Sequence, residues 1–513
     1  MQKFWATELA EKIIEKKGKD LTIATGISPS GKIHIGNMRE VLTADFVRRE
    51  LENLGAKVRF VFISDDIDRL RKLYPFLPQE FSKYIGYPLT DIPDPEQDGH
   101  DSYAKHFEAP FLRVLDRLGI YPEKLSATKM YKEGFYTDLV ATALTKQDEI
   151  KNILAKVSGR KMPDDWSCYN PICANCHKID EAKVTKIDIA NHRVFYHCSC
   201  GHEDWADYAK GQGKLSWRVD WPARWSKIPV DVEPYGKEHG TVGGSYDTGV
   251  AICKDIYKHE PPFGITYDLV YLRGFKGKMS SSLGNVVSAD EFLAVVPPEI
   301  LRFMFAKVRF DKSFYFDMGT GLLQLVDEYT SMGEKYEQGI LSDGEKAIYE
   351  VCQIAHNGKV KKLIPFRHLI NAIQASCNNF HEIKRILSRT EHFSSDDEDL
   401  QEQITRANTW LEKYAPDNVR FSVQQDTPQI DLTDKQKQLL ANVANILDSK
   451  ECEAEALHNQ IYESGKKLEL KPKETFEAIY LALLGKSSGP KAGWFISVLD
   501  KQFVIDRFKT LSK

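Results

Sequence analysis

Two short segments far apart in the sequence carry residue types that suit a nucleoside triphosphate. Residues 29–37 read Pro-Ser-Gly-Lys-Ile-His-Ile-Gly-Asn, and residues 276–282 read Lys-Gly-Lys-Met-Ser-Ser-Ser. His34 and the amide of Asn37 can donate hydrogen bonds to phosphate oxygens, and Lys278 can bring a positive charge to them from a Gly/Ser-rich loop. Each segment alone would most often be an ordinary turn or surface loop. Together they favour a site for the phosphates of a nucleotide, where chemistry depends on positioning and charge stabilisation.

The first segment lies between a predicted strand and a predicted helix. Leu21–Thr25 is a short β-branched run, and apolar residues recur at helical spacing from Met38 to Phe46. Residues 58–63 form a nearly continuous apolar run, which is typical of a buried parallel strand. Such a βαβ unit directs the free N–H groups of a helix N-terminus toward the segment. Gly31 and Gly36 would let the backbone or an adenine ring approach closely.

Size and composition indicate a globular protein of several domains. For 513 residues we expect about two to four domains, and 42% apolar with 28% charged residues is typical of globular chains. No apolar run approaches the length of a membrane span, and residues 1–20 lack the apolar core of a signal peptide. We therefore expect a cytoplasmic protein. With a net charge of −4, any RNA contact would need a local basic surface.

Two insertions are predicted within the first half of the chain. Residues 74–101 are rich in Pro, Gly and acidic residues, which indicates an inserted loop or small lobe. Residues 151–205 hold most of the cysteines and form the second insertion. Strands are expected again at Leu215–Val219 and Leu269–Leu272, and the latter leads into the second glycine-rich segment.

From about residue 332 the pattern changes to helices. Thr433 followed by Gln436 resembles a capping box, and the apolar residues that follow recur at helical spacing. Another apolar stripe runs from Phe476 to Leu484, and Gly485 is the type of residue that ends a helix. These patterns predict an all-helical C-terminal part.

The cysteines point to a metal site. The chain has nine cysteines, and most of them are clustered in two close pairs and one neighbour, Cys168. Structural zinc is commonly held by such pairs, whereas buried reduced cysteines are the simpler alternative. His202 or Cys168 could replace one ligand. We expect a structural zinc ion bound by Cys173, Cys176, Cys198 and Cys200.

The two glycine-rich segments and several others resemble class I lysyl-tRNA synthetases. Residues 34–37 and 278–282 are similar to the "HIGH" and "KMSKS" motifs of class I aminoacyl-tRNA synthetases. The similarity to the lysine enzymes extends over nearly the whole chain, through residues 25–31, 62–66, 217–221, 236–239, 243–247, 480–485 and 488–490.

The resemblance implies a fold and a reaction. The fold is α/β, with a Rossmann-type parallel-sheet catalytic domain over 1–275 that carries insertions at about 75–130 and about 151–205. A KMSKS loop and stem-contact region over 276–331 and a helical anticodon-binding domain over 332–513 would follow. The implied reaction joins L-lysine to tRNA(Lys) with ATP and Mg²⁺, releasing AMP and pyrophosphate, and we expect the protein to act as a monomer.

Site residues are also implied. ATP would contact Pro29, Ser30, Gly31, His34, Gly36, Asn37, Lys278 and Met279. One departure from the KMSKS motif is Ser281, which stands where the second lysine is usual. The reaction would therefore depend on His34, Asn37, Lys278, Ser280, Ser281 and Ser282.

A lysine pocket should offer apolar or aromatic walls and a carboxylate, because a desolvated ammonium group without a partner is costly. The resemblance places Gly26 and Ser28 next to the substrate, with Trp217, His239 and Tyr267 lining the pocket. Trp217 or Tyr267 could present a π face to the ammonium. Either Asp220 or Asp247 could pair with it.

A second metal site is left open. Some members of the family use an Asp, a Cys and two His as ligands, but the cysteine position here is Gly99. His100 and His106 remain, and Asp94 or Asp98 could join them.

Three alternatives compete with the lysine reaction. A glutamyl-tRNA synthetase would need an arginine beside the first motif, whereas the candidates here are aromatic and acidic. A nucleotidyltransferase of the same superfamily would generally lack the long helical part. A non-catalytic RNA-binding relative would not need His34, Asn37 and Lys278.

Overall fold

The computed structural model describes residues 3–274, 287–354, 363–388, 396–449 and 453–513. The chain forms two compact units. The first comprises Met1–Leu293, Pro298–Phe316 and Ile340–Gly358, and the second comprises Ala294–Pro297, Asp317–Gly339 and Lys359–Lys513. Within the described residues, no helix is both long and apolar enough to cross a membrane.

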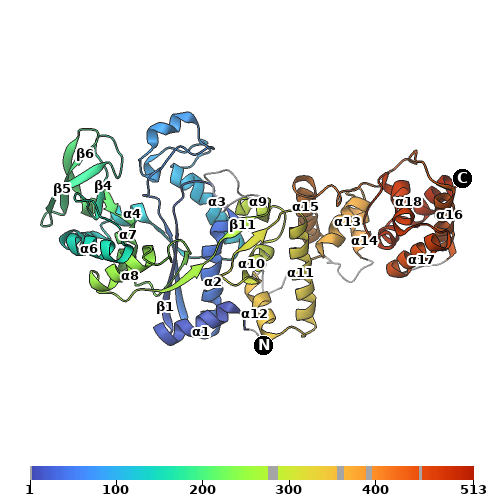
Figure 1. Cartoon of the computed structure of the whole chain (residues 1–513), viewed down its shortest axis with the longest axis horizontal. Helices are drawn as coiled ribbons and strands as arrows, with labels where there is room; N and C mark the ends of the chain where they lie inside the picture. Colours follow the sequence, from blue (N-terminus) through green and yellow to red (C-terminus); the bar gives the residue numbers. More distant parts are fainter. Residues whose placement is uncertain (1–2, 275–286, 355–362, 389–395, 450–452) are drawn as a thin grey trace. The chain divides into compact units, whose positions relative to one another are not determined.

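A parallel sheet forms the centre of the first unit (Figure 1). Its strand order is β10-β9-β1-β2-β3, and every pairing is parallel. The chain order reverses between β1 and β9, and ligands bind outside the carboxyl ends of the strands at such a point. The expected Rossmann-type fold is confirmed. The strands are β1 (Asp20–Ile27), β2 (Lys57–Ser64), β3 (Glu123–Ser126), β9 (Val232–Gly236) and β10 (Phe263–Tyr267).

Helix α2 (Met38–Asn53) follows β1, as the sequence predicts. Its apolar residues at helical spacing, such as Val41, Leu42 and Phe46, are fully buried. The helix ends before Gly55, whose φ of +79° is the left-handed conformation that glycine adopts at low cost. Strand β1 pairs with β2 in register from Asp20↔Lys57 to Ile27↔Ser64. This βαβ unit fixes the first motif at the carboxyl edge of the sheet.

Two expectations about this unit need correction. The strand predicted at Leu215–Val219 is a short strand, β8 (Gly213–Leu215), followed at once by helix α7 (Trp217–Lys227). Alternating apolar residues suggested a strand, but Trp217, Trp221 and Trp225 also recur every four residues. Their rings contact one another in succession, with centroids 5.2 Å and 4.9 Å apart. This packing of the three indole rings along one face stabilises the helical conformation of residues 217–227 over a strand.

The first insertion is shorter than the stretch 75–130. Its small lobe has its own core, formed by residues such as Leu77, Phe81 and Leu89. Helix α3 (Tyr103–Arg117) then leads to β3, which pairs in parallel with β2. Because a strand at this position completes the edge of the main sheet, the second half of the stretch belongs to the sheet and its covering helices.

The cysteine-bearing insertion contains small antiparallel sheets. Strands β5 (Ala182–Asp188), β6 (Arg193–Cys198) and β7 (Glu203–Asp207) form one sheet, and β4 (Tyr169–Pro171) pairs with β8. We refer to residues 169–215 as the cysteine lobe.

The remaining elements of the first unit are short connections and covering helices. They are α1 (Trp5–Lys17), η1 (Ile35–Asn37), η2 (Gln79–Tyr84), η3 (Leu89–Asp91), α4 (Ala127–Lys132), α5 (Thr137–Thr145), α6 (Gln147–Ser158), η4 (Tyr208–Lys210), α8 (Ser245–Asp255), β11 (Val270–Leu272), α9 (Ala289–Leu293), α10 (Pro298–Ala306), β12 (Phe314–Phe316) and α12 (Asp343–Cys352).

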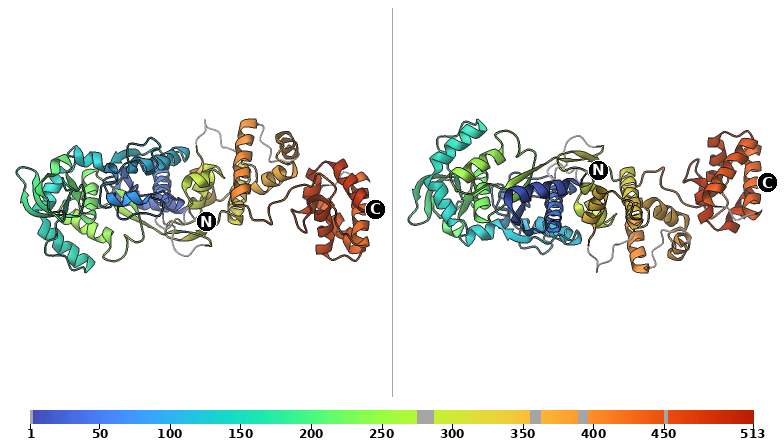
Figure 2. Two further views of the ribbon diagram at one scale, coloured as in Figure 1. Left: turned by 90° about the horizontal axis from the view of Figure 1, so that it is seen from above. Right: turned by 90° about the horizontal axis from the view of Figure 1, so that it is seen from below.

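The second unit is helical in its described residues. Its last five helices pack together, as both views in Figure 2 show. Helix α11 belongs to this unit and α12 to the first, so the two units divide the chain differently from the boundary we expected at residue 332. The helices are α11 (Thr320–Glu337), α13 (Phe366–Ala375), α14 (Phe380–Leu387), α15 (Asp397–Lys413), α16 (Asp434–Ser449), α17 (Ala454–Lys467), α18 (Pro472–Leu484), α19 (Ala492–Val498) and α20 (Lys501–Leu511).

The capping box predicted at the start of α16 is present. Thr433 Oγ1 accepts a hydrogen bond from Gln436 N at 3.3 Å, and Gln436 Oε1 accepts one from Thr433 N at 3.1 Å. Thr433→Ala should therefore lower the stability of the helical unit by about 1 kcal/mol, because N–H groups at the helix start lose a partner. Thermal unfolding followed by circular dichroism should show a melting temperature lower by about 2–4 °C.

Thr409→Ala is the matched control. The Thr409 hydroxyl donates to Thr405 O at 3.0 Å inside helix α15, where it completes no cap. Its loss should change stability by less than about 0.5 kcal/mol. Equal effects of the two substitutions would contradict the capping role.

Candidate active site

The first motif forms a turn that leads from β1 into α2. His34 N donates to Asn37 Oδ1 at 3.1 Å, so the side-chain amide nitrogen of Asn37 remains a donor for a ligand. Ile35 N donates to Val287 O at 3.0 Å, and His34 forms a bridge with Ser288. Residues 287 and 288, a few positions after the second motif, therefore lie against the first motif. The second motif itself, with Lys278, Met279, Ser280, Ser281 and Ser282, lies outside the described residues.

The other residues expected to bind ATP surround the same turn. Pro29 and Gly31 are buried. Ser30 N donates to Ser28 O at 2.8 Å, and Ser30 O accepts a hydrogen bond from the Tyr103 hydroxyl at 2.8 Å. Gly36 lies within η1, the single turn that opens α2. The loop is thus held by its own backbone and by α3, with the N-terminal turn of α2 beside it.

A carboxylate that the sequence analysis did not single out lies beside Gly26. Glu40 Oε1 accepts from Gly26 N at 2.9 Å, and Oε2 accepts from the Tyr267 hydroxyl at 2.8 Å. Among the described residues, none forms an ion pair with Glu40. Burial raises the pKa of Glu40 to about 8; the two hydrogen bonds lower it, and the nearby carboxylates Glu233 and Asp65 raise it further. A carboxyl group without a counter-ion among the described residues therefore lies at the ends of β1 and β10. In the sequence, Glu40 could be recognised only as an acidic residue in the first turn of the helix that follows the motif.

Aromatic side chains form one wall at the ends of β9 and α7. The rings of Trp217 and Trp221 stack with an interplanar angle of 16°. The His239 ring lies 6.0 Å from Trp217 and 5.7 Å from Trp221 between centroids. Behind them, Glu233 accepts hydrogen bonds from the indole N–H groups of Trp221 and Trp225. Burial raises the pKa of Glu233 to about 7.

The two aspartates expected to pair with an ammonium have other partners. Asp220 is fully buried, with Arg224 at 2.6 Å and Lys214 at 3.9 Å, and it also accepts a hydrogen bond from the Tyr131 hydroxyl. Its charge is therefore already compensated. Asp247, in the first turn of α8, accepts from Gly243 N at 2.9 Å.

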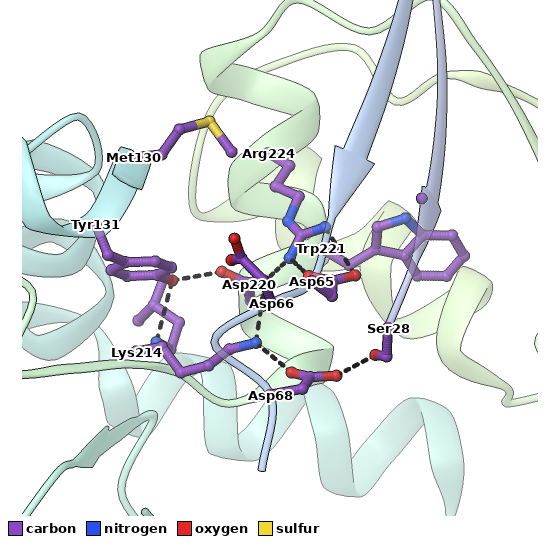
Figure 3. A network of polar contacts seen from close by, with 12 residues as sticks. Ser28, Asp65, Asp66, Asp68, Met130, Tyr131, Lys214, Asp220, Trp221 and Arg224 are labelled. Carbon is purple, nitrogen blue, oxygen red and sulfur yellow. Dashed lines mark hydrogen bonds and ion pairs between the residues drawn. The ribbon is translucent and has the colours of Figure 1, made fainter. Parts of the chain in front are cut away.

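A buried polar network joins these elements (Figure 3). Arg224 bridges Asp220 and Asp65, and Lys214 bonds Asp68 at 2.8 Å. Asp68 in turn accepts a hydrogen bond from the hydroxyl group of Ser28, the residue that follows β1. Five carboxyl groups gather in this region, Glu40, Glu233, Asp65, Asp68 and Asp220, and the ion pairs of Lys214 and Arg224 serve the three aspartates. Since unpaired buried charge is costly, such a site favours a ligand that carries positive charge.

The four cysteines expected to bind zinc do converge. Their sulfur atoms all lie within 4.8 Å of one another. Cys173 Sγ is 3.7 Å from Cys200 Sγ, and Cys176 Sγ is 3.6 Å from Cys198 Sγ. A tetrahedron with Zn–S bonds of about 2.3 Å has S···S edges of about 3.8 Å, so the cluster fits zinc. Neither alternative ligand, Cys168 nor His202, belongs to the group.

A second group that could hold a metal ion lies in the first insertion. It consists of Asp98, His100 and His106, whose potential ligand atoms also lie within 4.8 Å of one another. His106 Nδ1 is 3.0 Å from Asp94 Oδ1 and 3.3 Å from Asp98 Oδ1. Both aspartates that the sequence left open are thus close to the histidines.

Comparisons with known proteins agree with this arrangement. The model of the family "tRNA synthetases class I (K)" matches residues 3–355, and that of the "Anticodon binding domain" matches residues 360–511. The chain is 43% identical to Lysine–tRNA ligase 1 of Methanosarcina acetivorans, over 99% of this chain and 98% of that protein. It is 40% identical to Lysine–tRNA ligase of Archaeoglobus fulgidus, over 98% and 99%. The chain therefore belongs to the class I (K) family of tRNA synthetases.

Proposed function

We propose that this protein is a lysine–tRNA ligase. It activates L-lysine with ATP to lysyl-adenylate, releasing pyrophosphate, and transfers the lysyl group to tRNA(Lys), releasing AMP. The observation that carries the proposal is the Glu40 carboxyl group, which lies between Gly26 and Tyr267 and has no ion-pair partner among the described residues. The full-length similarity to proteins named lysine–tRNA ligase supports the same reaction.

Glu40 is our candidate for the partner of a lysine ammonium group. It is a half-buried carboxyl group that accepts hydrogen bonds from neutral donors and has no ion-pair partner among the described residues. Trp217, His239 and Tyr267 would line the four-carbon stem, and Gly26 and Ser28 would contact the substrate from the end of β1. Asp247 remains a second candidate near the aromatic wall, whereas Asp220 serves the buried network.

A glutamyl-tRNA synthetase fits the site less well. A glutamate side chain needs a positive partner, and Arg224 is one buried cation beside the network. Its guanidinium group already bonds two carboxylates, Asp65 and Asp220, and is 4% exposed. Recruiting this group would leave buried carboxylates without a counter-ion, which is strongly unfavourable.

ATP, in complex with Mg²⁺, would bind along the first motif. The N-terminal turn of α2 and the Asn37 amide suit phosphate oxygens, and His34 lies beside the segment that follows the second motif. The helical unit would contact tRNA(Lys). We also propose that the protein acts as a monomer in the cytoplasm and that the cysteine lobe holds a structural zinc ion.

ATP–pyrophosphate exchange tests the proposal. The twenty amino acids are compared with and without tRNA, followed by charging of tRNA(Lys) with labelled amino acid. Lysine should be the amino acid that supports exchange and charging. If glutamate alone supported exchange, or if lysine did not charge tRNA(Lys), the proposed function would be wrong.

Lys278→Ala tests the role of the second motif. We expect kcat to fall about a hundredfold, because a cation that stabilises the leaving pyrophosphate acts mainly in the transition state. The lysine KM should change less than threefold. Steady-state charging kinetics measure both values, and a raised lysine KM with normal kcat would contradict this role.

A further inference from the structure

The Ser28 hydroxyl has a fixed direction in the structure. A serine hydroxyl has one proton to donate and two lone pairs that accept. Ser28 Oγ donates its proton to Asp68 Oδ2. The hydroxyl group of Ser28 can then only accept a hydrogen bond from a ligand at the end of β1, through its lone pairs.

Asp68 can only accept because Lys214 holds it ionised. Lys214 Nζ donates to Asp68 Oδ1 at 2.8 Å, and this lysine is 5% exposed. Burial raises the pKa of Asp68, but the charge of Lys214 and the hydrogen bonds from Lys214 and Ser28 outweigh it and hold that pKa below its usual value. A carboxylate without a proton has no donor to offer. The direction of the Ser28 O–H bond therefore follows from a lysine in strand β8.

We propose that Asp68 and Lys214 are positioning residues, which fix Ser28 as an acceptor for an ammonium group of the amino acid. This inference rests on the proposed function. A protonated amine donates hydrogen bonds and satisfies a lone pair of Ser28, whereas a carboxylate oxygen would meet another acceptor.

The surroundings of Asp68 contain charged groups of both signs. A cavity of about 250 Å³ borders Asp68 and Lys214, with the half-exposed Trp217 on its wall. Arg69, which also lines the cavity, forms an ion pair with Asp180 at 2.6 Å. The charged groups that face Asp68 from the packed elements are Lys214, Arg224, Asp65, Arg69, Arg71 and Asp180.

Asp68→Asn inverts the direction of the hydrogen bond while it keeps the shape of the side chain. Lys214 needs an acceptor, so the amide oxygen should face Lys214 and the amide N–H₂ should face Ser28. In the variant, this amide would occupy one lone pair of Ser28, and the serine O–H, no longer bonded to Asp68, could turn toward the substrate ammonium and weaken its binding. We expect the lysine KM to rise about thirtyfold and the ATP KM to change less than threefold.

Lysine analogues distinguish the two ammonium groups. In one analogue a hydroxyl replaces the ε-ammonium, and in the other a hydroxyl replaces the α-ammonium. A hydroxyl can accept as well as donate, so the analogue altered at the group that faces Ser28 should inhibit the wild-type and Asp68→Asn enzymes equally. The other analogue should lose affinity about thirtyfold, as lysine does. Equal losses for lysine and both analogues would overturn the inference.

Ser28→Ala provides an independent test of the same hydrogen bond. It should weaken lysine binding about tenfold, and adding Asp68→Asn to it should have little further effect, because the bond is already absent. Additive effects of the two substitutions would contradict the coupling. If the wild-type enzyme did not use lysine at all, the proposed function itself would fail, which is a separate outcome.

Asp66→Asn is the matched control. Asp66 also accepts from a serine, Ser126 Oγ at 2.5 Å, and from Thr128 N at 2.7 Å. It lies two residues from Asp68 but has no hydrogen bond to Ser28. Its replacement should affect stability without the analogue pattern described above. The same selective loss in Asp66→Asn would show that Asp68 acts only through the fold.

Lys214→Met adds a readout in pH. Without the lysine, burial should raise the pKa of Asp68, so that Asp68 takes up a proton as the pH falls. The lysine KM of Lys214→Met should therefore rise more steeply below pH 7 than that of the wild-type enzyme, and Lys214→Arg should restore the wild-type slope. If a folded Lys214→Met enzyme had the same pH dependence of the lysine KM as the wild-type enzyme, the proposal would be overturned. If Lys214→Met does not fold, the kinetics of Asp68→Asn provide the test.

Discussion

Glu40→Gln should lower kcat/KM for lysine about a thousandfold. Truncating one partner of a buried charge pair typically costs about 2–5 kcal/mol, and about 4 kcal/mol corresponds to a thousandfold. Glutamine keeps the size of the side chain and an oxygen that can accept from Gly26 N. The loss would therefore report the missing charge opposite the lysine ammonium. Steady-state exchange kinetics with lysine and with ATP as the varied substrates measure it, and the ATP KM should stay within threefold.

The pH profile separates this role from a structural one. Burial raises the pKa of Glu40 to about 8, so in the free enzyme most Glu40 is protonated at pH 7. A lysine ammonium favours the ionised form, so binding should release a proton. In the wild-type enzyme kcat/KM for lysine should rise as pH increases toward 8 and then level off. Glu40→Gln should lack this rise.

Glu50→Gln is the control on the same helix. Glu50 is also buried, and it accepts from the neutral donors Thr7 Oγ1 at 2.6 Å and Asn53 Nδ2 at 3.2 Å. We expect its replacement to leave kcat/KM within about threefold. A Glu40→Gln enzyme with normal kinetics, or one that kept the rise toward pH 8, would show that lysine binds elsewhere.

Removing zinc or one of its ligands should abolish the folded cysteine lobe. Structural zinc contributes about 10–16 kcal/mol of apparent binding free energy in small metal-binding domains. Cys173→Ser should therefore give a protein that has lost zinc and is readily cleaved by protease within residues 169–215. Atomic emission measures the metal, and limited proteolysis followed by mass spectrometry locates the cuts.

We expect lysine activation to be lost together with the lobe. Lys214 lies in the strand that pairs with β4 of the lobe, and its bond to Asp68 depends on that pairing. Cys168→Ser is the control, because Cys168 is a buried thiol outside the metal-binding group. It should keep the full zinc content and the protease resistance. If Cys173→Ser kept one zinc ion per chain, the assignment of the four ligands would be wrong.

The parts of the fold that the sequence predicted well are those that depend on neighbouring residues. The periodicity from Leu21 to Ile63 reports local burial, so β1, α2 and β2 were recognisable. The capping box at Thr433 and the glycine after α18 were likewise predictable, because each depends on only a few adjacent residues. The convergence of the four cysteines was also predictable, because two close pairs already bring sulfur atoms together.

The missed features depend on contacts between distant residues. Glu40 is one acidic residue among many in the sequence, and only the fold places it between Gly26 and Tyr267. Asp220 was a candidate for lysine because nothing in the sequence shows that Arg224 and Lys214 already surround it. The segment Leu215–Val219 alternates as a strand would, and only the packing of Trp217 against Trp221 and Trp225 shows that it begins a helix.

The direct junction of β8 and α7 also determines where this protein could tolerate changes in length. Ser216 alone separates Leu215, the last residue of the strand, from Trp217, the first residue of the helix. An α-helix turns by about 100° per residue, so a single inserted residue here would rotate the whole aromatic face away from Glu233. Hairpin tips such as residues 189–192 are free of this restriction. A chimaera that takes the cysteine lobe from a related protein should therefore keep the same number of residues at this junction. Loops elsewhere in the lobe can differ in length between related proteins.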